Sequence, residues 1–173
     1  MSITLTELLA SRDARVEHQK ELAEKYPRAS LICFTVMLPG PVKRDWRSLV
    51  IAGEGIKALK AKLNALHEEE RDLETGFEAY FVVDMEPLEV KRLCCSIEDE
   101  HPLGRLMDID VVCHFDRSGE ISLKPLSRED IGLAARHCLL CEKPARECMR
   151  AHSHSPEEIQ DTIDRMVQDY NLR

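Results

Sequence analysis

The sequence predicts a single mixed α/β domain of the α+β class, with a small cysteine- and histidine-containing annex at its C-terminal end. Short runs of β-branched and aromatic residues, bounded by proline or glycine, are interspersed with segments of helical periodicity. The chain has 173 residues, 43% of them hydrophobic, which suits one domain with a real core. No internal repeat or linker interrupts it. Residues 1–173 are therefore expected to form one domain, in which residues 136–173 are the cysteine/histidine segment and a terminal helix.

The first part of the chain favours a helix followed by a strand. Thr4 or Thr6 can cap a short helical turn, and Ser11 precedes a second start, for a helix that runs to Tyr26. The run of residues 31–38 is rich in β-branched and aromatic side chains and lies between prolines, which predicts a buried strand.

A second helix is expected to begin at Asp45, after a proline-rich loop at residues 39–41. Gly53 and Gly55 weaken its first half. Its apolar residues recur at helical spacing: Leu49, Ile56, Leu59, Leu63 and Leu66. The polar run of residues 68–74 is expected to be a solvated turn.

Two further strands are expected, at residues 77–83 and 106–115, with a helix between them. Pro87 suits the first turn of that helix, although a strand is the alternative. Residues 101–105 form a bend before the later strand, and the turn at residues 116–119 is expected to return the chain as a hairpin.

Composition excludes several classes of function. The net charge of −8 gives no support to broad nucleic-acid binding, and no stretch approaches the roughly 18 apolar residues of a membrane span. The N-terminus lacks the features of a signal peptide, so we expect a cytoplasmic protein that binds neither nucleic acid nor membrane. A polyanionic substrate would need a local cluster of basic residues or a metal.

The most informative pair is Asp108 and Asp110. Alternate residues of a strand share a face, so the two carboxylates are expected side by side, where a cation such as Mg²⁺ would relieve their repulsion. Gly104 and Arg105 lie just upstream and suit a phosphate, and the preceding His101 enters the same bend. This pattern favours transfer of a phosphoryl or nucleotidyl group from a triphosphate donor. The alternative is that both aspartates simply occupy the solvent face of a half-buried strand.

The seven cysteines suit free thiols or metal ligands better than a disulfide framework. Cys138, Cys141, Cys148 and His152 have the types and spacing of a tetrahedral Zn²⁺ site, with His154 as a competing fourth ligand. Simple packing of buried thiols is one alternative, and a redox C-x2-C pair is another.

Four motifs, in order along the chain, resemble the apo-citrate lyase phosphoribosyl-dephospho-CoA transferases, also called citrate lyase holo-acyl-carrier-protein synthases. They lie at residues 11–15, 34–43, 98–111 and 136–150, and the third carries the run His101-Pro-Leu-Gly-Arg-Leu-x-Asp108-Ile-Asp110. The resemblance covers nearly the whole chain and is weakest between about Leu66 and Val90.

The resemblance implies a reaction and a partner. In the family, a serine of the citrate lyase acyl-carrier (γ) subunit attacks 2′-(5″-triphosphoribosyl)-3′-dephospho-CoA, and pyrophosphate leaves. This is nucleotidyltransferase-type chemistry, so we expect a nucleotidyltransferase-like sheet flanked by helices. Asp108 and Asp110 would then be the catalytic residues and hold Mg²⁺, while Gly104 and Arg105 would contact the triphosphate.

Other residues of the motifs are candidates for substrate binding. Arg12, Arg15 and Lys43 supply positive charge for the triphosphate, although Arg12 and Arg15 could equally pair with acids of their own helix. His101 is a further candidate. Glu98 fits the third motif, but the sequence assigns it no role.

Two other functions stay open at this point. One is a non-catalytic, zinc-bearing adaptor for the lyase carrier subunit, with the aspartates merely exposed. The other is a related transferase that acts on the carrier of malonate decarboxylase.

Overall fold

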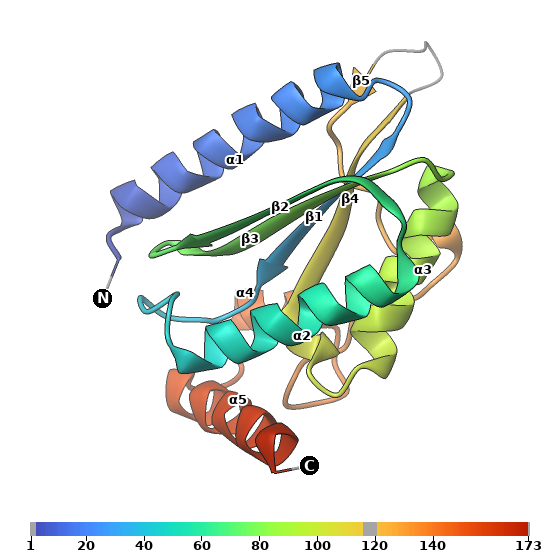
Figure 1. The fold of residues 1–173 in the computed structure, drawn as a ribbon. Helices are drawn as coiled ribbons and strands as arrows, with labels where there is room; N and C mark the ends of the chain where they lie inside the picture. The colour runs from blue at the N-terminus through green and yellow to red at the C-terminus, as the bar shows by residue number, and fades with distance from the viewer. Residues whose placement is uncertain (1–2, 116–120, 173) are drawn as a thin grey trace.

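The structure, a computed structural model, describes residues 3–115 and 121–172 and is built on one antiparallel sheet (Figure 1). Its strand order is β2-β3-β1-β4-β5. The strands are β1 (Ser30–Val36), β2 (Ala65–Leu73), β3 (Gly76–Val83), β4 (Met107–Phe115) and β5 (Ile121–Ser122). The predicted mixed α/β architecture is confirmed.

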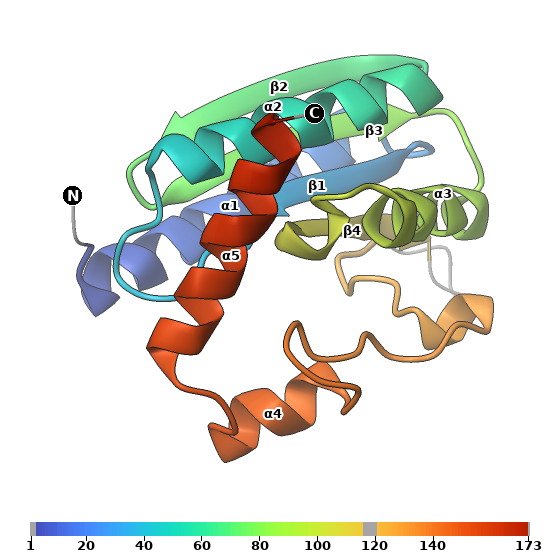
Figure 2. The same ribbon diagram turned by 90° about the horizontal axis from the view of Figure 1, so that it is seen from below.

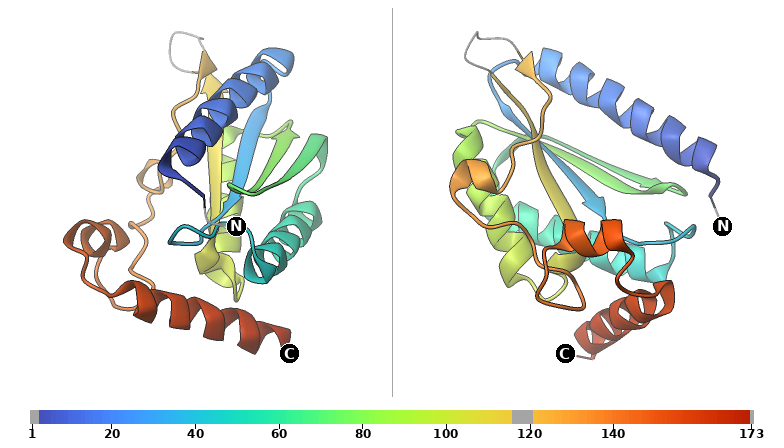
Figure 3. Two further views of the ribbon diagram at one scale, coloured as in Figure 1. Left: turned by 90° about the vertical axis from the view of Figure 1, so that its left-hand side faces the viewer. Right: turned by 180° about the vertical axis from the view of Figure 1, so that it is seen from behind.

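Helices cover both faces of this sheet. They are α1 (Leu5–Lys25), α2 (Trp46–Lys62), α3 (Pro87–Glu100), α4 (Ala145–Ala151) and α5 (Pro156–Asn171), with 3-10 turns at Gly104–Leu106 and Glu129–Ile131. Helix α1 lies alone on one face, α2 and α3 lie on the other, and α5 crosses α2 (Figures 1 and 2). Helix α4 and the loop before it are set apart from these layers (Figure 3).

Two apolar clusters fill the space between the layers. The larger joins the sheet to α2, α3 and α5 through residues such as Phe34, Leu59 and Ile109. The smaller joins the opposite face to α1 through residues such as Leu22 and Tyr80. The two faces of β4 therefore look into different environments.

The helix starts follow the capping rules, with one correction. Thr4 and Glu7 form a capping box, so α1 is one continuous helix from Leu5, and the second start that we expected after Ser11 is wrong. Asp45 caps α2 as predicted. Because the first cap already satisfies the free N–H groups of the helix start, a second start is unnecessary.

Gly55 has a packing role that its helix propensity does not suggest. A Cβ at this position would lie 2.4 Å from Cζ of Phe34, so the missing side chain lets α2 approach the sheet closely. Leu66, which we assigned to the same helix, lies instead in β2 and is exposed.

The charged run of residues 68–74 is not a turn, as we expected, but most of the edge strand β2. It pairs with β3 from Ala65 to Leu73, and its burial alternates. Acidic side chains of β2 are matched by cations, because Lys60 lies 3.0 Å from both Glu68 and Glu70. A charged edge strand discourages pairing with other chains, and the long pairing with β3 overrides the low strand propensity of the run.

The other predicted elements are confirmed within small shifts of their ends. These are the strands at residues 31–38, 77–83 and 106–115 and the helix that begins at Pro87. Strand β5 pairs with the end of β4 as the expected hairpin requires, but the turn at residues 116–119 lies outside the described residues. None of the described helices is long and apolar enough to cross a membrane.

Candidate active site

Strand β4 presents Asp108 and Asp110 on the face of the sheet that α1 covers. In the adjacent β1, Thr35 lies opposite Asp108 and Cys33 lies opposite Asp110. Cys33 packs in the cluster under α1, whereas Ile109, between the two acids, is fully buried in the opposite cluster. The two carboxylates therefore share one face, as strand alternation predicts.

The electrostatic environment of the pair favours a cation. Burial, together with the neighbouring charge of Asp110, raises the pKa of Asp108 to about 6, although Arg136 and Lys91 act in the opposite direction. Lys91 Nζ lies 3.6 Å from Asp110 Oδ1. A divalent ion between the carboxylates would stabilise both in their charged forms.

Side chains of helix α3 form hydrogen bonds with the main chain of this part of β4, as a neighbouring strand would. Glu98 Oε1 accepts a hydrogen bond from the Ile109 N–H at 2.9 Å, and Lys91 Nζ donates to the Ile109 carbonyl at 3.5 Å. Both side chains are buried, with 3% and 4% exposure for Glu98 and Lys91. Buried backbone groups need such partners, so α3 fixes the residue that lies between the two aspartates.

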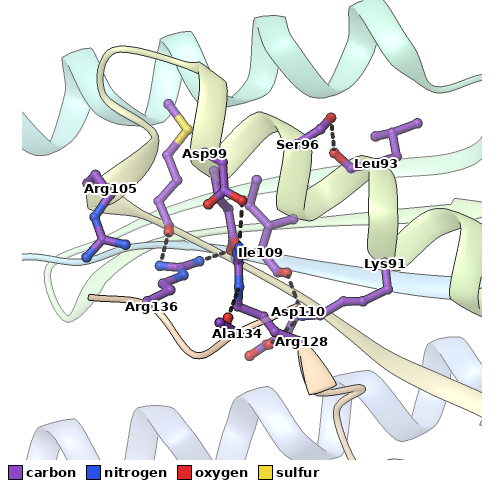
Figure 4. Close-up of polar contacts among 12 residues, drawn as sticks. Lys91, Leu93, Ser96, Asp99, Arg105, Ile109, Asp110, Arg128, Ala134 and Arg136 are labelled. Atoms are coloured by element: carbon purple, nitrogen blue, oxygen red, sulfur yellow. Dashed lines mark hydrogen bonds and ion pairs between the residues drawn. The ribbon is translucent and has the colours of Figure 1, made fainter. Parts of the chain in front are cut away.

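Two arginines from the chain after β5 neutralise the acidic end of α3 (Figure 4). Arg136 forms an ion pair with Glu98 and donates to the Met107 carbonyl at 3.0 Å. Arg128 lies 3.4 Å from Glu98 Oε2 and 2.6 Å from Asp99 Oδ2. The buried charge of Glu98 thus links α3, β4 and the C-terminal part of the chain.

These arginines and Arg105 meet at one pocket of ≈ 400 Å³. The lining residues are Asp99, Arg105, Arg128, Leu133, Ala134, Ala135, Arg136 and His137. Burial and the charge of Arg136 lower the pKa of Arg105, which donates a hydrogen bond to the His137 carbonyl. Among the described residues, these three guanidinium groups form ion pairs with only two carboxylates, those of Glu98 and Asp99, so the pocket suits an anion such as a phosphate.

The basic residues of the N-terminal motifs, Arg12, Arg15 and Lys43, lie on the α1 face. Arg15 is paired with a carboxylate, whereas Lys43 lies near Arg12. Arg15 pairs with the buried Glu78 at 2.8 Å, and the Tyr80 hydroxyl donates to the same carboxylate at 2.6 Å. Arg15 therefore pairs with a strand acid rather than with an acid of its own helix. Lys43 donates to a main-chain carbonyl, and its pKa is lowered by burial and by the nearby charge of Arg12.

Comparison with known proteins decides the family. The chain matches, over residues 3–170, the family described as apo-citrate lyase phosphoribosyl-dephospho-CoA transferase. The chain belongs to this family.

Similar proteins carry the family name. "Probable apo-citrate lyase phosphoribosyl-dephospho-CoA transferase" of Vibrio cholerae is 34% identical over 99% of this chain and 95% of its own length. The protein of the same name from Streptococcus pyogenes is 33% identical over 98% of this chain and 88% of its own length. "Protein CitXG" of Haemophilus influenzae is 37% identical over 98% of this chain, but the chain spans only 36% of that protein. The Vibrio and Streptococcus names are those of a transferase.

Within the family motif of residues 98–111, Gly104 is a packing residue. A Cβ there would lie 2.4 Å from the Glu98 carbonyl oxygen and 2.6 Å from that of Ile97. Its N–H is also used, because it donates to the His101 carbonyl at 2.8 Å. Gly104 therefore holds the turn that carries Arg105 against the end of α3.

His101 is not brought to the aspartate pair. Its ring stacks at a tilt on Tyr170 of α5, with centroids 5.6 Å apart, and its Nδ1 accepts from the Leu103 N–H at 3.1 Å. Tyr170 packs against the cluster of the α2 face. The substrate role expected for His101 stays a prediction.

The structure gathers a cysteine and histidine cluster in the segment of residues 136–155, called below the cysteine segment. The ligand atoms of Cys138, Cys141, Cys148 and His154 all lie within 4.8 Å of one another. The cluster has His154 in the place that we expected for His152. Helix α4 ends at Ala151, so His152 lies just past its end and adopts a left-handed conformation with φ of 47°.

Sequence reasoning missed Lys91, Arg128 and the role of Glu98. Glu98 and Arg136 stand inside the family motifs, and that membership was the only available signal. Nothing in the local sequence marks Lys91 or Arg128, because their contacts join segments far apart along the chain.

Proposed function

We propose that this chain transfers the phosphoribosyl-dephospho-CoA group from 2′-(5″-triphosphoribosyl)-3′-dephospho-CoA to a serine of the apo citrate lyase acyl-carrier (γ) subunit. Family membership supports the reaction. The observation that carries the site is the Asp108–Asp110 pair on β4 together with an arginine-lined pocket. Arg136 links the two, because it lines the pocket, donates to the Met107 carbonyl and lowers the pKa of Asp108 through its charge.

The bond changes define what the site must do. The serine Oγ forms a bond to the α-phosphorus, the bond from that phosphorus to the β-phosphate oxygen breaks, and pyrophosphate leaves with the electron pair. The hydroxyl proton passes to solvent or to Asp108. Most of the catalytic work is then positioning and charge stabilisation.

Asp108 and Asp110 fit Mg²⁺, because they are hard oxygen ligands two residues apart on one strand face and the charge of one raises the pKa of the other. A bound Mg²⁺ would neutralise charge on the transferring phosphate and align the attacking and leaving oxygens. Lys91 would hold the Asp110 carboxylate in place from the α3 side.

We assign the phosphates of the donor to the pocket of Arg105, Arg128 and Arg136. A guanidinium group can donate two parallel hydrogen bonds to the oxygens of a phosphate. Of the three arginines, Arg105 is the one without an ion pair to a carboxylate among the described residues. Arg12 and Lys43 are proposed as further donor contacts from the α1 face, whereas Arg15 serves to hold Glu78. We assign the reaction to the cytoplasm, a compartment that suits the free thiols of the six described cysteines.

The direct experiment is to incubate the chain with the donor, Mg²⁺ and the apo-carrier, and to record the intact mass of the carrier. A mass increase on one carrier serine is expected, with loss of at least about 100-fold in rate for Asp110→Asn and after chelation of the metal. Asp161→Asn, on the exposed side of α5, is the matched control and should keep the wild-type rate.

Two outcomes would redirect the proposal. An adaptor would give no mass increase with any donor, and its binding to the carrier would be indifferent to Asp110→Asn. A transferase for another enzyme would modify the carrier of malonate decarboxylase faster than that of citrate lyase.

A further inference from the structure

We propose that Cys138, Cys141, Cys148 and His154 bind one structural Zn²⁺ ion, which holds the cysteine segment in shape and positions Arg136 beside the active site. The proposal of the zinc site itself does not depend on the transfer reaction. Its effect on Arg136 rests on the proposed function.

The distances fit a tetrahedral zinc ion. Zn–S bonds of about 2.3 Å and Zn–N bonds of about 2.0–2.1 Å give tetrahedral edges of about 3.8 Å between two sulfurs and about 3.6 Å between sulfur and nitrogen. Cys141 Sγ lies 3.5 Å from Cys148 Sγ and 3.4 Å from His154 Nε2. Three thiols and one imidazole make the Cys₃His set of many closed structural sites.

The thiols are arranged as ligands rather than as a disulfide. A disulfide needs a sulfur separation of about 2.05 Å, well below the 3.5 Å between Cys141 and Cys148. The Leu140 N–H points to Cys138 Sγ at 3.5 Å, as main-chain groups do toward a thiolate. Binding would convert three thiols to thiolates and release their protons to solvent.

The cysteine segment has little else to hold it. Every residue from 136 to 155 is described, and Cys148 is the only buried one among them. Helix α4 has seven residues, too few to be stable alone, and its one large apolar side chain, Met149, is 68% exposed. Leu139 alone among these residues packs against the larger apolar cluster. Because apolar burial is this sparse, a metal bound by the four ligand side chains would hold the segment together.

The metal site is joined to Arg136 through the main chain. The Cys138 N–H donates to the Lys143 carbonyl at 2.7 Å, and the Ala145 N–H donates to the Arg136 carbonyl at 2.9 Å. This small ladder places Arg136 two residues before a ligand and opposite the start of α4. Fixing the ligands therefore fixes the main chain from which the Arg136 guanidinium reaches Glu98 and Met107.

The two nearby histidines provide a matched pair of variants. His154 is half-buried in the cluster, whereas His152 is exposed at the end of α4. We expect the full chain, purified without added metal, to contain one zinc per molecule. Removal of an outer-sphere partner costs about 10–100-fold in affinity, so His154→Ala should cost more than about 100-fold, while His152→Ala should keep the wild-type affinity.

Cobalt substitution reports the ligand set directly. The wild-type chain and His152→Ala should show the visible d–d bands and thiolate charge-transfer bands of tetrahedral Co²⁺, and His154→Ala should lose or shift them. A chain without stoichiometric metal, a Cys141–Cys148 disulfide seen in the intact mass, or retention of affinity in His154→Ala would each overturn the proposal.

The link to Arg136 has its own readout. His154→Ala should raise the KM for the donor several-fold more than it lowers kcat, while leaving Mg²⁺ dependence unchanged. Asp108→Asn should abolish transfer and still bind one zinc. If zinc binds but the wild-type chain modifies no carrier, the zinc site stands and the proposed function fails. Equal KM values for His154→Ala and the wild type would show that the zinc site does not position Arg136.

Discussion

The region around β4 and α3 and the cysteine segment contribute neighbouring parts of one site, but different forces hold them. In the first, Ile109 is fully buried, and its main-chain groups are satisfied by the buried Glu98 and Lys91. In the second, only Cys148 is buried among residues 136–155. Arg136 belongs to the second region and reaches into the first.

The two regions therefore meet different structural requirements. Under the proposed function, the aspartate pair would have to be held firmly for a metal, and a strand fixed on both sides provides that. The arginines would have to reach around phosphates, and Arg136 comes from irregular chain that needs its own anchor. Substitutions in the first region should therefore change stability through core packing. Those in the second should act through polar contacts and the proposed zinc ligands.

The largest stability effect is expected for Glu98→Gln. It removes the charge that Arg136 and Arg128 share while the arginines remain, and the loss of one partner of a buried ion pair costs about 3–5 kcal/mol. The thermal midpoint should fall by roughly 10 °C. Glu100→Gln, exposed on the same helix, is the control; an equal midpoint for the two variants would show that the network is not stabilising.

The next effect concerns Gly104. Gly104→Ala should cost about 1–3 kcal/mol in the free energy of unfolding, because its Cβ would lie 2.4 Å from the Glu98 carbonyl. Gly53→Ala is the matched change in α2, where a Cβ meets nothing within 4 Å, and should stabilise by about 0.5–1 kcal/mol. Denaturant unfolding measures both. A neutral Gly104→Ala would mean that the turn can shift away from α3.

Asp108 should make the stability of the metal-free chain depend on pH. Its pKa is raised to about 6 in the folded chain from a value near 4 in the unfolded chain. The charged carboxylate therefore lowers the free energy of unfolding, an effect that is absent below about pH 4 and fully present above about pH 6. Asp108→Asn should then stabilise the chain by about 1–2 kcal/mol at pH 7–8 and leave it unchanged at pH 4.

Mg²⁺ sharpens this test, since it should stabilise the wild type at pH 7–8 but not the variant. Thermal unfolding across the pH range reads out both effects. If Asp108→Asn destabilised the chain equally at every pH, Asp108 would have a structural role that does not depend on its ionisation.

The smallest effect is expected for Met149→Ala in the cysteine segment. Its side chain is 68% exposed, so the free energy of unfolding should change by less than about 0.5 kcal/mol. Ile163→Ala in α5, which removes a buried side chain, should cost about 2–5 kcal/mol. A large loss for Met149→Ala would show that apolar packing holds the segment after all.

Much of this molecule could be predicted from local pattern. The apolar runs gave β1, β3 and β4, and alternation placed Asp108 and Asp110 on one face. Strand β2 could not be predicted this way, because its charged residues become a strand only through pairing with β3.

The site was predicted only where its residues are close in sequence. Lys91 and Glu98 of α3 meet Asp110, Arg128 and Arg136 of later segments, and no periodicity reveals such contacts between distant parts of the chain. The choice of His154 over His152 depended on where α4 ends, and helix ends are poorly fixed by sequence.

We propose that Asp108 and Asp110 together bind one divalent ion, beside a pocket suited to phosphate. Crystals grown with Mn²⁺ and pyrophosphate would test it, since anomalous scattering locates the metal. We expect a manganese peak at the two carboxylates, with pyrophosphate oxygens contacting Arg105 and Arg136. Manganese bound elsewhere, or pyrophosphate held away from the arginine pocket, would contradict it.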